Sequence, residues 1–111
     1  MSVRYMIRLP DPARARAAGE FAFRSQGAEG LAVELQEALR GDGLFQRWRA
    51  AQEDPDAVDP ALGATDPSAV VEGAQHDLHV DLVATTSIPG AVFKHRMRLL
   101  AGSAWELRDV R

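Results

Sequence analysis

Apolar and polar residues alternate over much of the C-terminal third of the chain. Between residues 78 and 85 an apolar side chain occupies every second position, which is the period of a strand with one buried face. The same period fits residues 92–100, and residues 105–110 continue it. Pro89-Gly90 and Ala101-Gly102-Ser103 separate the three stretches and are typical turn sequences. The pattern therefore predicts three antiparallel strands joined by two turns.

One register satisfies both faces of this predicted meander. On the inner face Met97 lies opposite Leu82 and Leu107, and on the outer face Arg98 lies opposite Asp81. Because side chains alternate between the two faces of a strand, a shift by one residue would break both sets of pairs.

Two further strands are expected near the N-terminus. Residues 3–9 alternate as a half-buried strand, and Pro10 ends it because proline cannot continue the ladder. Residues 20–25 are expected to form a second strand, antiparallel to the first, with Phe21 and Phe23 inward.

Two helices follow. From residue 28 to residue 40 the apolar period changes to 3.6, which indicates an amphipathic helix. Gly41 stands where a left-handed C-cap is expected, and Asp42 is placed to cap a second, shorter helix that ends near Gln52.

The resulting element order is ββααβββ in a single domain, residues 1–111. It predicts an α+β fold with a mostly antiparallel five-stranded sheet and the helices packed on one face. Residues 53–68 contain three Asp-Pro pairs and few apolar residues. A connection of this length predicts a functional or mobile loop, and this one is acidic.

Charge is divided unevenly along the chain. Residues 53–81 hold eight acidic residues and no Lys or Arg, whereas the rest holds thirteen basic and eight acidic residues, so the net charges are −8 and +5. The absence of Cys excludes disulfides and fits a reducing compartment. No apolar stretch approaches the about 18 residues of a membrane span, and the N-terminus lacks the apolar run of a signal peptide. We therefore expect a cytoplasmic protein.

The outer face of the predicted sheet gathers the candidate partner-binding residues. They are Arg4, Arg8, Lys94, Arg96, Arg98 and Arg108. A face with excess arginine can receive an acidic segment of a partner protein, and the acidic loop 53–68 can cover it when the partner is absent. Nucleic acid is disfavoured, because every strand aromatic falls on the inner side and none is available for base stacking. Exposed edge strands also leave open a homodimer through a sheet edge.

A cavity between sheet and helices is the alternative, for a small molecule or for catalysis. In the predicted register His95 faces Asp109, and an imidazole held by a carboxylate is what a general base requires. No Ser or Cys nucleophile is placed beside this pair. The sequence therefore favours a non-enzymatic interaction domain over an enzyme, and no motif in it indicates a cofactor.

His76 and His79 are the remaining candidates for chemistry. On one strand they are three positions apart and point to opposite faces, so they cannot chelate one ion as two histidines on a helix face do. The sequence therefore predicts no metal site.

Overall fold

Four antiparallel strands form one sheet in the computed structural model, which describes residues 2–111. The strands are β1 (Val3–Leu9), β2 (Val70–His76), β3 (His79–Thr86) and β4 (Glu106–Val110), and they lie in the order β2-β3-β1-β4. The helices are α1 (Pro12–Arg16), α2 (Ala28–Arg40), α3 (Gly43–Ala50) and α4 (Gly90–Ala101). Two short 3-10 helices, η1 (Pro55–Ala57) and η2 (Pro60–Gly63), lie between α3 and β2.

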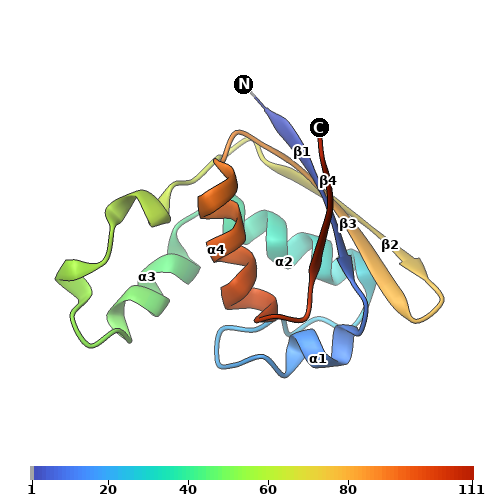
Figure 1. Cartoon of the computed structure of the whole chain (residues 1–111), viewed down its shortest axis with the longest axis horizontal. Coiled ribbons are helices and arrows are strands. Elements are labelled where there is room, and N and C mark those ends of the chain that lie inside the picture. Colours follow the sequence, from blue (N-terminus) through green and yellow to red (C-terminus); the bar gives the residue numbers. More distant parts are fainter. Residues whose placement is uncertain (1) are drawn as a thin grey trace.

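The principal elements follow the order β1-α2-β2-β3-α4-β4, with β1 and β3 in the middle of the sheet. This is the ferredoxin-like βαββαβ topology, in which each helix connects two strands that are not neighbours. The helices lie on one side of the sheet (Figure 1). The other face of the sheet is therefore left open.

The core lies between the sheet and the helices. Alternate residues of the two central strands point into it and are buried: Tyr5, Ile7, Leu9, Val80, Leu82 and Ala84. The ring of Tyr5 stacks on that of Phe93 in α4, with centroids 4.1 Å apart, and its hydroxyl donates to the Ile88 carbonyl at 2.7 Å. Leu31, Leu35 and Leu39 of α2 are fully buried beside them. Alternation on the strands and the 3.6 period on the helix thus meet in one apolar layer.

The prediction that residues 92–100 form a strand is wrong, because they belong to α4. Pro89 is the N-cap of this helix rather than part of a hairpin turn. The buried side of α4 follows helical spacing and comprises Val92, Phe93, Arg96, Met97, Leu100 and Ala101. The predicted pairs of this segment with residues 78–85 and 105–110 do not form, since β3 pairs with β1 and β2, and β4 pairs with β1.

The predicted strand at residues 20–25 is also absent, so the sheet has four strands and not five. Phe23 is nevertheless buried, and its backbone N–H donates to the Leu100 carbonyl at 2.8 Å. The backbone N–H groups of Arg24 and Ser25 donate to the Glu34 carboxylate. These contacts hold the segment on the helices instead of on β1.

Other predictions are confirmed. The strand at residues 3–9, the helix at residues 28–40 and the buried parity of Val80, Leu82 and Ala84 appear as expected. Two expectations are wrong. Leu78 was expected on the buried face with Val80, but it is 86% exposed, because it lies in the turn between β2 and β3. Gly41 has a φ of −130°, so the expected left-handed cap is not formed there.

Residues 53–68, called the strap from here on, form an ordered connection that packs on α3 and α4 (Figure 1, green to yellow). The buried guanidinium of Arg96 donates to the carbonyls of Leu62 and Ala64, each at 2.9 Å. At the far end of the strap, the Asp66 carboxylate accepts from the Thr86 hydroxyl and the Ser87 N–H, each at 2.9 Å. The strap thus lies on the helical layer and does not cover the open face of the sheet, contrary to the prediction.

Candidate functional site: the open face of the sheet

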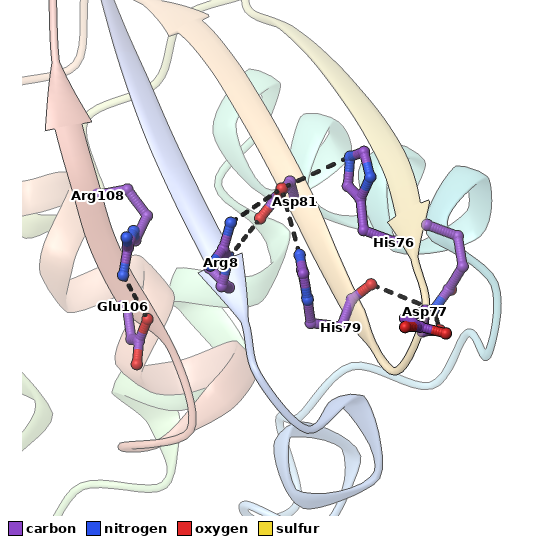
Figure 2. A network of polar contacts seen from close by, with 8 residues as sticks. Arg8, His76, Asp77, His79, Asp81, Glu106 and Arg108 are labelled. Atoms are coloured by element: carbon purple, nitrogen blue, oxygen red, sulfur yellow. Dashed lines mark hydrogen bonds and ion pairs between the residues drawn. The ribbon is translucent and has the colours of Figure 1, made fainter.

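The open face is built from the outward positions of all four strands. Its residues are Arg4, Met6, Arg8, Val70, Glu72, Ala74, His76, His79, Asp81, Val83, Thr85, Glu106, Arg108 and Asp109. Figure 2 shows a group of polar side chains on this face, which project away from the helices: Arg8, His76, His79, Asp81, Glu106 and Arg108. No helix among residues 2–111 is long and apolar enough to cross a membrane.

An ion pair joins the two central strands at one end of this face. Arg8 and Asp81 stand directly opposite each other, and Nε and Nη2 of Arg8 donate to Oδ1 and Oδ2 of Asp81 at 2.9 and 3.5 Å. The hydrogen bond from Arg8 is the main cause that lowers the pKa of Asp81, because it stabilises the ionised carboxylate. Asp81 therefore remains a fixed negative charge on the surface.

His76 and His79 share the open face, so the prediction that they point to opposite faces is wrong. The turn Asp77-Leu78 falls between them, and they form the last directly opposed pair of β2 and β3. Asp77 has a φ of 59°, a left-handed conformation that Asp tolerates better than most residues. Their imidazole centroids are 5.5 Å apart, and Nε2 of His76 and of His79 lies 3.6 and 3.5 Å from Asp81 Oδ2 (Figure 2).

Two hollows lie on the open face and share Met6 and Val83 as their apolar floor. The larger, of 420 Å³, is bordered by Arg4 and Glu72, and the smaller, of 230 Å³, by Arg8, Asp81 and Arg108. The centre of the face is thus apolar and its border is charged.

The predicted partner-binding residues separate into two groups. Arg4, Arg8 and Arg108 lie on the open face, whereas Lys94 and Arg98 lie on the exposed side of α4 and Arg96 is buried. The three arginines of the face are accompanied by four acids, Glu72, Asp81, Glu106 and Asp109. The expected excess of arginine on the sheet face is therefore wrong, because it depended on a strand at residues 92–100.

Two of these arginines are already paired within the chain, and the third is not. Arg108 contacts Glu106 at 3.2 Å, and Arg8 is held by Asp81. Within residues 2–111, Arg4 takes part in no ion pair. Arg4 is therefore the cation of this face that is best placed to bind a carboxylate from another molecule.

His95 and Asp109 do not form the predicted catalytic pair. His95 lies on α4, where its ring contacts the edge of Trp48 at a centroid distance of 4.5 Å. Burial, and then the charges of Arg96 and Arg98, lower the pKa of His95. Asp109 lies on β4 and accepts a hydrogen bond from Arg111 Nε at 2.6 Å. The sequence placed these two residues opposite each other through the register of the predicted strand at residues 92–100, and that strand does not form.

Sequence reasoning missed the apolar centre of the face and the shared side of the two histidines. Asp77 was the available signal, since Asp is common in turns and a turn at residues 77–78 puts His76 and His79 on neighbouring strands. Within residues 2–111, no group of three or more His, Asp or Glu side chains is arranged to hold a metal ion.

Comparisons with protein-family models, with curated proteins and with solved structures found no match to this chain. Its function therefore has to be inferred from its own residues.

Proposed function

We propose that this chain is a non-enzymatic interaction domain whose open sheet face binds a short, extended, acidic segment of a partner protein. The observation that supports this proposal is the arrangement of the open face, with Met6 and Val83 at its centre and Arg4, Arg8 and Arg108 around them. An apolar centre with a polar, charged border is the usual anatomy of a protein-binding surface.

The size of the face favours a short segment over a second folded domain. Four strands about 4.8 Å apart and some seven residues long cover roughly 20 by 23 Å, or about 450 Å². A stable interface between two folded proteins buries about 800 Å² on each partner. The open face is therefore about half the size that such an interface needs, whereas an extended segment fits within it.

The spacing of the arginines indicates how the segment lies. Arg4, Met6 and Arg8 are successive outward residues of β1, so neighbouring side chains are about 6.6 Å apart. An extended segment of the pattern Glu-x-Leu-x-Glu presents three side chains at the same spacing and with complementary character. Arg4 provides the main contact, because Asp81 already engages Arg8.

Binding of a fluorescent peptide with the sequence Glu-Thr-Leu-Thr-Glu tests the proposal. We expect weak, saturable binding by fluorescence anisotropy that falls as salt rises, because exposed charges are screened within about 10 Å at 0.1 M salt. In NMR spectra of the isotope-labelled protein, the chemical-shift changes of backbone amides on peptide binding should be largest in β1 and β3. Arg4→Glu should weaken binding several-fold, since it replaces attraction with repulsion.

Arg98→Glu is the matched control. It makes the same charge change on the exposed side of α4, at a residue that the sequence alone assigned to the binding face. Equal loss of affinity in the two variants, or amide shifts centred on α4, would contradict the proposed surface. Binding that persists unchanged in Arg4→Glu would do the same.

A further inference from the structure

The free end of the β2-β3 hairpin carries two histidines that face the same carboxylate oxygen. His76 and His79 are directly opposed across the ladder, and their two Nε2 atoms lie 3.6 and 3.5 Å from Asp81 Oδ2. Hydrogen bonds from nitrogen to oxygen are mostly about 2.7–3.2 Å long, so both contacts are longer than a typical one. The Nε2 atom of His79 is buried and has no hydrogen-bond partner among residues 2–111. The Nε2 atom of His79 is therefore the unsatisfied polar atom of this site.

A divalent transition-metal ion would satisfy this atom. Neutral imidazole nitrogen is a preferred ligand of Zn²⁺, Ni²⁺ and Cu²⁺, at about 2.0–2.1 Å for Zn²⁺. Both Nε2 atoms lie within 3.6 Å of one point, Asp81 Oδ2, so the two imidazoles converge at the same place and can reach one ion. The carboxylate of Asp81 adds a negative charge beside them, and Arg8 holds it in position.

We propose that His76 and His79 chelate a divalent transition-metal ion at the free end of the β2-β3 hairpin. The ion has two imidazole ligands from the chain, and water completes its coordination. Asp81 contributes through its charge, because Arg8 Nε holds its Oδ1 at 2.9 Å and the carboxylate is shared with that guanidinium. This site is separate from the main contact of the peptide-binding proposal, since Arg4 and the larger hollow are not part of it, but the Arg8–Asp81 ion pair belongs to both surfaces.

Two protein ligands make a site that is weaker than a structural zinc centre, which has four. The ligand type also sets its selectivity. Zn²⁺, Ni²⁺ and Cu²⁺ should bind, with Cu²⁺ tightest, whereas Mg²⁺ and Ca²⁺ should not, because those two ions prefer oxygen ligands.

Titration of the untagged chain with Zn²⁺, followed by the imidazole resonances in NMR spectra, tests the proposal. The chain has three histidines, so His95 on α4 is an internal control. The resonances of His76 and His79 should shift together and saturate at one Zn²⁺ per chain, while those of His95 stay unchanged. Calorimetry should show at least about a tenfold loss of affinity in His76→Gln and in His79→Gln.

His95→Gln should leave the affinity unchanged. Zn²⁺ should also raise the unfolding midpoint of the wild-type chain but not of the His76→Gln/His79→Gln double variant, because an ion that binds only the folded state stabilises it. Absence of saturable binding overturns the proposal. So does binding that survives in the double variant, or that shifts the resonances of His95 instead.

Discussion

Replacement of Arg96 by methionine tests how the strap is held against the helices. Arg96 lies on α4 with no exposed surface, and its guanidinium donates to three backbone carbonyls, those of Ala38, Leu62 and Ala64. Ala38 lies near the C-terminal end of α2, where the helix dipole favours a positive charge. Burial lowers the pKa of Arg96, yet arginine stays protonated in proteins. A single cation thus joins α2, α4 and the strap.

The expected loss of stability follows from these bonds. A hydrogen bond to a charged group contributes about 1.5–3 kcal/mol, which gives an upper range of about 4.5–9 kcal/mol for three. Two effects offset part of this loss. The wild-type protein already bears the cost of desolvating the guanidinium, and in the variant the carbonyls of Leu62 and Ala64 regain hydrogen bonds to water when the strap opens. We therefore expect Arg96→Met to lower the free energy of unfolding by about 3 kcal/mol.

Urea denaturation followed by circular dichroism measures this loss, and amide hydrogen exchange locates it. Exchange should accelerate most in η1 and η2, which belong to the strap. Arg98→Met, an exposed position on the same helix, should change stability by no more than about 0.5 kcal/mol. If Arg96→Met were as stable as the wild type with unchanged exchange in the strap, the three bonds would not hold it.

Two further changes probe other contacts. Gly73→Ala should lower the free energy of unfolding by about 1–3 kcal/mol, because a Cβ there would lie 2.5 Å from the Ala28 carbonyl oxygen. Gly19 has open space around it, so Gly19→Ala should leave the free energy of unfolding unchanged. The urea midpoints of the two variants measure the difference. Hydrogen bonds, first from the Ser87 N–H and then from the Thr86 hydroxyl, lower the pKa of Asp66 in the folded state. Its contribution to stability should therefore be present above the unfolded pKa of about 3.9 and disappear as the pH falls through the lower folded pKa. Urea midpoints measured from about pH 6 to about pH 3 should fall less steeply in Asp66→Ala than in the wild type, and equal slopes would contradict this reasoning.

The hydrophobic pattern predicted the elements whose apolar residues follow a single period. Residues 3–9 and 28–40 are of this kind, and both were predicted with the observed bounds. Residues 92–100 fit two periods, because Phe93 and Met97 are four positions apart and also share the same strand parity. Because Arg96 is charged, its buried position interrupts the apolar stripe of the helix. The sequence therefore fitted the period of a strand better than that of a helix. The abundance of Met, Leu, Lys and Arg, all strong helix formers, was the signal for a helix.

The sequence placed residues of the candidate site correctly only on the strands that it predicted correctly. Arg4, Arg8 and Asp81 were placed on the outer face correctly, because the alternation of β1 and β3 decides their side. Which strands are neighbours is a different question, and alternation within a strand does not answer it. The opposition of Arg8 to Asp81 depends on the pairing of β1 with β3, strands far apart in sequence, which only the folded chain reveals.

The position of β1 in the sheet has a consequence for how the chain is made. Val3 pairs with Thr86 and Tyr5 pairs with Val110, so both neighbours of the first strand come from the last third of the sequence. At about 5–20 residues per second, a ribosome needs on the order of 4–16 s after β1 to complete β3. Throughout that interval a strand with one apolar face has neither of its partner strands. Contacts so distant in sequence also slow folding, so β1 stays unpaired until most of the chain has been made.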